Sequence, residues 1–319
     1  MTPSKNELAV GVDLGGTTVK TGLVTKSGEL IYQNKFASDS QQGPELVIGQ
    51  VALSIEDALK HANGGEITGI GVGAPGVVDN DGLVKAPPNF ANWEAVPLGT
   101  ELEKKFNGIH VNVENDANCA AIAEAKFGVG KDHPDFLFVI WGTGIGGGII
   151  LNHRLYRGPS GGAGEVGHIA IDYNGPLCGC GAHGCIEAFI GQKYLSQRTA
   201  ERVKAQPSSL ILKLVGGDYS KIEPVYISQA AEAGDALALS ILTEAGTLLG
   251  VAIGAVMNTM DLRVSVIGGG VSAAGDLVIK AIKDSVCAHV LKPLRPGIQV
   301  LQAKLGNNAG ILGAAGLVL

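Results

Sequence analysis

Three cysteines, two histidines and two glutamates lie within one glycine-rich segment, residues 165–187. The cysteines have the spacing C-x-C-x4-C and are Cys178, Cys180 and Cys185. The glycines between them allow the backbone to turn sharply enough to direct three sulfur atoms at one point. Tetrahedral Zn²⁺ takes such ligands and needs a fourth, which His168 or His183 could supply. The segment therefore predicts a closed, structural zinc site, and the alternative is a loop with free buried cysteines.

Asp116 is the best candidate for a general base. A short strand is expected over residues 109–113, followed by Glu114, Asn115 and Asp116, and then by a helix that begins near Asn118. Open α/β sheets bind their ligands at this end of a strand. The Asp116 carboxylate can take a proton from a substrate hydroxyl as that oxygen attacks a γ-phosphorus atom. The alternative role for Asp116 is that of a helix N-cap.

A glycine-rich bend near the start of the chain has the donors that a phosphate group needs. Its sequence is D-x-G-G-T-T and it comprises Asp13, Gly15, Gly16, Thr17 and Thr18. Glycines let backbone N–H groups approach an anion, and the threonine hydroxyls add donors. Asp13 could hold Mg²⁺ directly or through water. We assign this bend and Lys20 to ATP, whereas the alternative is an ordinary β-turn.

Two further glycine clusters are candidates for nucleotide binding. The first spans residues 142–148, and we assign its Thr143 and Gly144 to ATP. The second, at residues 268–270, lies between an expected strand and an expected helix, where a ribose or phosphate could rest near the helix N-terminus. We assign Gly269 and Gly270 to this role.

The first two bends lie in copies of one pattern. Residues 8–36 alternate three β-rich runs with turns, and residues 136–156 repeat this order of strand, bend, strand, turn and strand. We interpret the repeat as an internal duplication at the scale of a domain. Two such bends, one in each lobe, could hold a triphosphate from both sides.

The remaining elements follow from hydrophobic spacing. Helices are expected over residues 44–61, 192–204, 227–233, 236–257, 276–290 and 307–319, strands over 67–72 and 262–267, and a functional Pro-rich loop over 85–93. Residues 206–221 are too mixed to assign, and the last helix must be buried against another element.

The bulk composition limits the class of protein. A chain of 319 residues favours two lobes, and a net charge of -6 with 5% aromatic residues disfavours nucleic acid as a partner. The start of the chain lacks an export signal, and the longest apolar run, residues 245–257, is shorter than the roughly 20 residues of a membrane span. We therefore expect a cytoplasmic protein with reduced thiols and no membrane partner.

Seven motifs, taken together in this order, resemble the ROK family (repressors, open reading frames and sugar kinases). They are DLGGT at 13–17, GAPG at 73–76, PPNF around Asn89, ENDAN at 114–118, GTGIGGG at 142–148, EVGH at 165–168 and CGCGAHGC at 178–185, closed by Glu187. The resemblance implies a two-lobed α/β fold of the actin-like ATPase (ribonuclease H-like) type, with ATP and a hexose between duplicated domains.

The resemblance also implies roles for individual residues. It makes His168, in preference to His183, the zinc ligand, and it assigns the catalytic base to Asp116. The implied sugar contacts are Asn89, Asn115, Asp116, Glu165, His168 and Glu187. We add Gly76 to this substrate site.

These observations predict a first lobe over residues 1–117, completed by residues 307–319, and a second lobe over residues 118–306 with the zinc segment. The expected activity is ATP-dependent phosphorylation of the 6-hydroxyl of a hexose, with glucose first and N-acetylmannosamine or N-acetylglucosamine as the alternative. A sugar-responsive transcription regulator is the third reading, although only twelve residues precede Asp13. A homodimer or larger homo-oligomer is expected. Sugar binding should close the lobes about hinges near residues 115–120 and 307–319.

Overall fold

The computed structural model describes residues 7–270 and 275–319, and the chain forms two compact units. Unit 1 comprises Met1–Pro134, Gly148–Gly164 and Lys304–Leu319, and unit 2 comprises Asp135–Gly147 and Glu165–Ala303. The first six residues, which entered the prediction that no export signal is present, lie outside the described residues. Each unit is described by itself below.

Unit 1 is built on a five-stranded sheet with the order β3-β2-β1-β4-β8. Its strands are β1 (Glu7–Leu14), β2 (Thr18–Thr25), β3 (Leu30–Ala37), β4 (Glu66–Ala74) and β8 (Val111–Asn115). The first three are antiparallel neighbours, which confirms the predicted meander, and β4 and β8 continue the sheet in parallel with β1. Parallel pairing places the carboxyl ends of β1, β4 and β8 at one edge.

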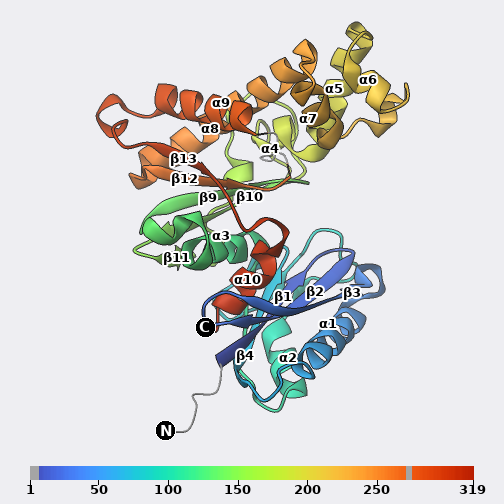
Figure 1. Ribbon diagram of the computed structural model, residues 1–319, viewed down its shortest axis with the longest axis vertical. Helices are drawn as coiled ribbons and strands as arrows, with labels where there is room; N and C mark the ends of the chain where they lie inside the picture. Colours follow the sequence, from blue (N-terminus) through green and yellow to red (C-terminus); the bar gives the residue numbers. More distant parts are fainter. Residues whose placement is uncertain (1–6, 271–274) are drawn as a thin grey trace. The chain divides into compact units, whose positions relative to one another are not determined.

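Helices cover both faces of this sheet (Figure 1). They are α1 (Pro44–Leu59), α2 (Leu98–Lys105), α3 (Asp116–Phe127) and α10 (Ala309–Gly316). The predicted helix over 44–61 is confirmed as α1, whose fully buried Val47, Val51 and Ile55 recur every four residues and pack on one face of the sheet. The other face packs against α10 through Ala9, Val24 and neighbouring residues.

Helix α10 lies so close to the sheet that side chains are excluded from the contact. A Cβ atom added to Gly11 or Gly71 would lie 2.1 Å from the carbonyl oxygen of Ile311 or 1.7 Å from that of Ala314. On its other side, a Cβ atom on Gly313 would lie 1.7 Å from the Cys119 carbonyl oxygen of α3. Backbone therefore packs on backbone at both surfaces of α10, and only glycine fits at these positions. The helix predicted over 307–319 is present but shorter. The 3-10 turn Gly306–Asn308 precedes α10, which spans Ala309–Gly316.

A small three-stranded antiparallel sheet interrupts the connection between β4 and α2. Its strands are β5 (Val77–Val78), β6 (Val84–Lys85) and β7 (Ala95–Val96). These strands were not predicted, because two residues leave no periodicity to detect. The predicted functional loop over 85–93 connects β6 to β7.

The second five-stranded sheet has the order β11-β10-β9-β12-β13, and the boundary between the units falls within β10. Its strands are β9 (Phe136–Trp141), β10 (Ile145–Leu151), β11 (Arg154–Tyr156), β12 (Val264–Gly268) and β13 (Gln299–Gln302). The predicted repeat of strand, bend, strand, turn and strand is confirmed as β9 to β11. Strand β13 was not predicted.

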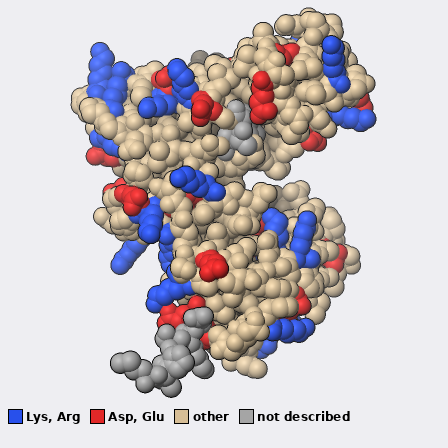
Figure 2. All heavy atoms as spheres, in the orientation of Figure 1, with Lys and Arg blue, Asp and Glu red and all other residues tan. Residues whose placement is uncertain are grey.

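The helices of unit 2 follow the zinc segment and β12. They are α4 (Glu187–Ile190), α5 (Gln192–Ala205), α6 (Leu210–Leu214), α7 (Pro224–Glu232), α8 (Ala236–Met260) and α9 (Asp276–His289). Helix α6 falls in the stretch that was left unassigned. Helix α8 is long and apolar enough to cross a membrane, but 56% of its apolar window is buried in the structure, as in the core helix of a soluble domain. On the face drawn in Figure 2, basic and acidic side chains are interspersed among uncharged surface.

The compact units differ from the predicted lobes in the placement of α3 and of Gly148–Gly164, which the prediction assigned to the second lobe and which belong to unit 1. The sequence predicts a boundary after residue 117, whereas α3 belongs to unit 1, where Ala123 packs with Ile311 and Ala315 of α10. Residues 117–124 of α3 are all buried, so the spacing of its apolar residues does not show which element covers which side of the helix. That the two lobes move as bodies stays a prediction.

Hydrogen bonds between side chains of β3 and α1 give unit 1 a pH-dependent contribution to stability. Asp57 accepts hydrogen bonds from the Tyr32 hydroxyl at 2.5 Å and from the Asn34 amide at 2.9 Å, and these bonds lower the pKa of Asp57. A carboxylate with a lowered pKa stabilises the fold above its unfolded pKa of about 3.9 and loses that contribution as pH falls through the folded value.

We expect Tyr32→Phe to unfold at a lower urea concentration than the wild type near pH 6, and this difference to shrink toward about pH 3. Phenylalanine keeps the stacking of residue 32 on His61 and removes only the hydroxyl. Urea unfolding across this pH range measures the effect, with Tyr219→Phe as the control. A difference that grows as the pH falls would contradict the assignment.

Candidate active site

The register of the sheet in unit 1 aligns the predicted phosphate and base residues. Asp13 on β1 pairs with Gly73 on β4, which pairs with Glu114 on β8. Neighbouring strands lie about 4.8 Å apart, so the backbones of Asp13 and Glu114 are roughly 10 Å apart at the carboxyl edge of the sheet. Asp116 follows Glu114 by two residues. The sheet therefore brings the D-x-G-G-T-T bend and the predicted base to the same edge.

The bend between β1 and β2 is fixed by hydrogen bonds on both sides. The Gly15 N–H donates to the Thr18 carbonyl at 2.9 Å, and the Gly16 carbonyl accepts a bond from the Ser40 hydroxyl at 2.6 Å. The Asp13 carboxylate forms an ion pair with Lys20 at 3.2 Å. A carboxylate and an ammonium group at one bend suit a phosphate with its metal ion.

Asn89 lies next to this bend. A Cβ atom on Gly16 would be 3.5 Å from the Asn89 Cβ, and the Asn89 carbonyl accepts a bond from the Gln41 amide at 2.8 Å. Asn89 has a φ of 66°, in the left-handed region that asparagine tolerates better than most residues. Its exposed side chain is therefore held by an ordered backbone beside the phosphate-type bend.

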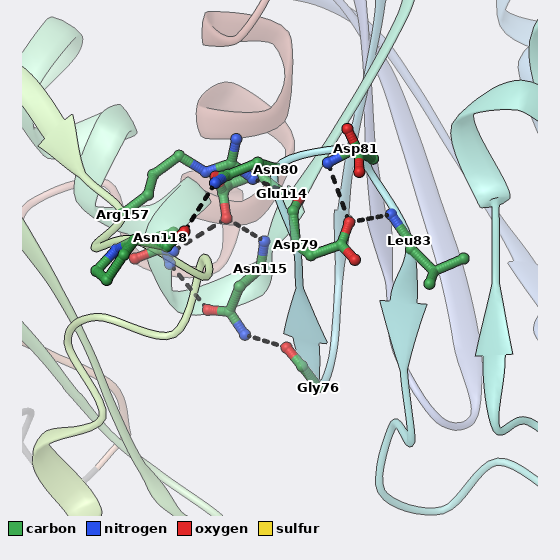
Figure 3. Close-up of polar contacts among 10 residues, drawn as sticks. Gly76, Asp79, Asn80, Asp81, Leu83, Glu114, Asn115, Asn118 and Arg157 are labelled. Atoms are coloured by element: carbon green, nitrogen blue, oxygen red, sulfur yellow. Dashed lines mark hydrogen bonds and ion pairs between the residues drawn. The ribbon is translucent and has the colours of Figure 1, made fainter.

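The start of α3 shows which residue caps the helix (Figure 3). The Asn115 side-chain oxygen accepts bonds from the N–H groups of Ala117 and Asn118, at 2.9 and 3.1 Å, so Asn115 is the N-cap. The Asn115 amide donates to the Gly76 carbonyl at 2.9 Å, and the left-handed Gly76 has no room for a Cβ atom. Asp116 is thus the first residue of α3, with an exposed side chain. The N-cap role weighed for Asp116 belongs to its neighbour.

In unit 2, the predicted sugar and ATP residues meet around the bend between β9 and β10. The Glu187 carboxylate accepts a bond from the Ile145 N–H at 2.8 Å, and a Cβ atom on Gly144 would lie 2.4 Å from the same carboxylate. A Cβ atom on Gly167 would lie 2.1 Å from the Ile145 carbonyl. Gly167 belongs to a 3-10 turn that follows Glu165 and ends at His168. The bend thus contacts both segments that carry predicted sugar ligands of this unit.

The third glycine cluster lies at the other end of the same bend. Gly269 has a φ of 92°, and a Cβ atom on it would lie 2.2 Å from the carbonyl oxygen of Trp141, just before the bend. Gly270 follows Gly269 and is exposed. In the bend itself, the Thr143 carbonyl accepts a hydrogen bond from the Gln192 N–H at 3.1 Å. All three glycine-rich segments predicted to bind the nucleotide therefore sit at strand ends, one in unit 1 and two in unit 2.

The four predicted zinc ligands form one cluster in unit 2. The ligand atoms of His168, Cys178, Cys180 and Cys185 all lie within 4.8 Å of one another. Two edges of the cluster are 3.7 Å, between Cys178 Sγ and His168 Nδ1 and between Cys180 Sγ and Cys185 Sγ. A tetrahedral site with Zn–S bonds of about 2.3 Å has S–S edges of about 3.8 Å. These two edges are compatible with a four-ligand zinc site.

The environment of the thiols differs from one cysteine to the next. Burial raises the pKa of Cys178 and raises that of Cys185 to about 12, whereas a hydrogen bond from the Ala182 backbone N–H lowers the pKa of Cys180. Thiolates, not thiols, bind zinc, so a cation at the centre would be needed to hold all three ionised. His183 instead faces the Gly175 carbonyl at 3.2 Å, which leaves His168 beside the thiols.

Arg157 has no part in the predicted site, yet it contacts the base-bearing segment. Its Nε atom lies 2.9 Å from the buried carboxylate of Glu114. No sequence signal identifies this contact, because the two residues are 43 positions apart (157 − 114) and Arg157 belongs to none of the motifs. The sites predicted from the sequence thus include the base Asp116 and the N-cap Asn115, but they do not include Arg157, which pairs with Glu114.

Known proteins resemble this chain over nearly its whole length. A family model of the ROK family matches residues 9–319. The chain belongs to the ROK family. It is 37% identical to a glucokinase of Streptomyces coelicolor, with 97% of each chain covered. A solved ROK glucokinase from Streptomyces griseus, in complex with glucose and AMPPNP, superposes with a TM-score of 0.84 at 36% identity over 98% of this chain and 99% of that one.

The ROK chain also matches a regulator. It is 29% identical to the xylose repressor of Bacillus subtilis over 98% of this chain but 77% of the repressor. The fold is the two-lobed actin-like ATPase fold of the ROK sugar kinases, as predicted from the motifs.

Proposed function

We propose that this ROK protein phosphorylates the 6-hydroxyl of glucose with ATP. The observation that carries the proposal is the similarity, over nearly the whole chain, to a ROK glucokinase solved with glucose and AMPPNP. The exposed carboxylate of Asp116, at the carboxyl edge of the sheet, also supports it, because such a group can accept the proton of the sugar hydroxyl. N-acetylmannosamine and N-acetylglucosamine are the alternative substrates.

In this proposal Asp116 accepts the proton of the sugar 6-hydroxyl as the sugar oxygen attacks the γ-phosphorus of ATP, and the bond between that phosphorus and the β–γ bridging oxygen breaks to release ADP. Phosphoryl transfer demands little covalent chemistry from the protein and depends mainly on position and charge. Asn89 and Asn115 would orient the sugar from unit 1, and Glu165, His168 and Glu187 from unit 2. Asp13 and Lys20, with the glycine bends, would hold the phosphates, and Mg²⁺ would neutralise charge on them.

A coupled assay of ADP release tests the substrate. Glucose, mannose, fructose and the two N-acetyl sugars are compared at equal concentration. We expect the highest kcat/KM with glucose. A higher value with an N-acetyl sugar would replace the substrate, and no sugar-dependent ADP release would overturn the kinase.

We also propose that the cluster of His168 and three cysteines holds structural Zn²⁺. The 3.7 Å edges of the cluster support this, because they match the ligand spacing of tetrahedral zinc. A closed site supplies no open position for the reaction, so the metal would shape the segment that carries Glu165 and Glu187. Reduced thiols would also suit the cytoplasm, where we place the protein.

We expect elemental analysis to find about one zinc per chain in the wild type and well under half of that in Cys180→Ser. The same variant should raise the KM for glucose more than the KM for ATP. Cys287→Ser is the matched control, because Cys287 is a free cysteine outside the cluster. A zinc-free protein that keeps full activity would remove the metal from the proposal.

The regulator reading is tested with the same preparation. Its distinguishing result would be retention on promoter DNA at physiological salt. We expect none, since the net charge of -6 opposes contact with a phosphate backbone. A homodimer or larger homo-oligomer stays our expectation for the assembly.

A further inference from the structure

Glu114 is a buried carboxylate that holds the start of α3 in place. Its side chain is 3% exposed. One oxygen, Oε1, accepts bonds from the Asn115 N–H at 2.8 Å and from the Asn118 side-chain amide at 3.0 Å. Asn115 is the N-cap of α3 and Asn118 lies in its first turn, so Glu114 contacts residues on both sides of Asp116. The position of Asp116 at the start of α3 therefore depends on this carboxylate.

Arg157 compensates the charge of Glu114 from the start of the loop that follows β11. Its Nε lies 2.9 Å from Glu114 Oε2, although its N–H does not point at that oxygen well enough for a hydrogen bond. The contact is therefore mainly electrostatic. Removing the partner of a buried carboxylate strongly destabilises the fold around it, because an uncompensated buried charge remains.

The same guanidinium also binds a second loop. Arg157 Nη2 donates to the Asp79 carbonyl at 3.0 Å, in the turn between β5 and β6. That turn is closed by its own contacts: the Asp79 carboxylate accepts hydrogen bonds from the N–H groups of Asp81 and Leu83, both at 3.0 Å, and pairs with Lys85 at 2.9 Å. Arg157 thus joins a fixed turn to the buried carboxylate under Asp116.

The loop of Arg157 is fastened to the turn at two further points. Asn80 donates its amide to the Pro159 carbonyl at 3.1 Å, and a Cβ atom on Gly161 would lie 2.2 Å from the Val78 carbonyl. The turn lies shortly after Gly76, whose carbonyl accepts a hydrogen bond from the Asn115 side-chain amide. Asn115 is therefore held by Gly76, just before β5, and by Glu114, which Arg157 links to the turn between β5 and β6.

We propose that Glu114 and Arg157 are positioning residues for the phosphoryl transfer, acting on Asp116 and Asn115 through the first turn of α3. The proposal depends on the function proposed above. Neither residue needs to touch the sugar or the nucleotide. Loss of the pair should then misplace the base, which lowers kcat, while most sugar contacts remain.

Arg157→Met is the first variant, with Arg154→Met as the matched control three residues earlier, where the side chain is exposed. We expect Arg157→Met to lower kcat for glucose by about 10-fold or more and to change the KM less than about 3-fold. Arg154→Met should match the wild type. A kcat within about 2-fold of the wild type in a folded Arg157→Met protein would overturn the proposal.

A double variant separates charge compensation from general destabilisation. Arg157→Met leaves a buried carboxylate without its partner, whereas Glu114→Gln with Arg157→Met leaves none, and glutamine can still accept the Asn115 N–H. We expect the double variant to recover part of the kcat lost in Arg157→Met. The losses of kcat in Glu114→Gln alone and Arg157→Met alone can be multiplied to give the loss expected of two independent residues. A double variant with that full loss would show that the two residues do not act as a pair. Arg157→Lys, which keeps the charge, should fall between the wild type and Arg157→Met, and it serves as the test should the methionine variant not fold.

Amide hydrogen exchange tests the positioning without any assay of the kinase. The peptide that contains residues 111–121 should exchange faster in Arg157→Met than in the wild type or Arg154→Met. Faster exchange in a protein with no sugar kinase activity would reject the proposed function and keep the positioning role. Unchanged exchange together with unchanged kcat in an active kinase would reject the positioning role alone.

Discussion

Replacing Asp116 by asparagine is expected to lower kcat for glucose by about 10²-fold or more, with the KM changed only a few-fold. Such a loss corresponds to roughly 2.7 kcal/mol of activation free energy. Asparagine has nearly the shape of aspartate, and its side-chain oxygen can still accept the bond from the Ala117 N–H that Asp116 accepts at 2.8 Å. The helix start should therefore stay intact while the proton acceptor is lost.

Steady-state kinetics and urea unfolding of the same variant separate these effects. Asp284→Asn serves as the control, since Asp284 pairs with Lys280 on the exposed side of α9. The midpoint of urea unfolding should be unchanged in both variants. Near-normal turnover in a folded Asp116→Asn protein would show that another group takes the proton.

Gly71→Ala is expected to give the largest loss of stability, about 3 kcal/mol or more, or to prevent the protein from folding. Gly71 lies in the centre of β4, and an added methyl group would lie 1.7 Å from the Ala314 carbonyl of α10. Neither the central strand nor the helix backbone can move aside cheaply, because β4 is paired on both edges and α10 is packed between the sheet and α3.

The same substitution at Gly49 is the matched control. Gly49 lies within α1, and a Cβ atom there meets nothing within 4 Å. Alanine favours a helix over glycine by up to about 1 kcal/mol, so Gly49→Ala should stabilise the protein. Urea unfolding of the two variants should thus shift in opposite directions. A Gly71→Ala protein with the urea midpoint of the wild type would disprove the close packing of α10.

Local patterns sufficed to predict the elements whose partners are near in sequence. The meander β1 to β3 and its repeat β9 to β11 could be predicted because each strand pairs with the next one across a short turn. The zinc cluster could be predicted for a similar reason, since three of its ligands lie within eight residues (178 to 185). The fourth ligand and the sugar contacts came from the resemblance to the ROK family.

Contacts between distant parts of the chain could not be predicted from pattern alone. Nothing in the sequence pairs Arg157 with Glu114, and nothing shows that α10 covers Gly11 and Gly71. Two-residue strands such as β5 leave no alternation to detect, and the N-cap could be assigned to Asn115 only once its bonds to Ala117 and Asn118 were known. In each case the missing information is the tertiary partner, not the local conformation.

The position of α10 in the chain has a consequence for biosynthesis. Unit 1 begins with β1, yet the helix that packs on β1 and β4 is made only after the whole of unit 2. While the ribosome is still translating unit 2, the sheet of unit 1 exposes the apolar face that Ile311, Leu312 and Ala315 will cover. Domains usually fold in order from the N-terminus as they emerge from the ribosome. Here, unit 1 cannot complete its packing until α10, which ends at residue 316, has been synthesised. A nascent chain stalled before that point should therefore hold unit 1 in an open, protease-sensitive state that a chaperone for apolar surfaces would recognise.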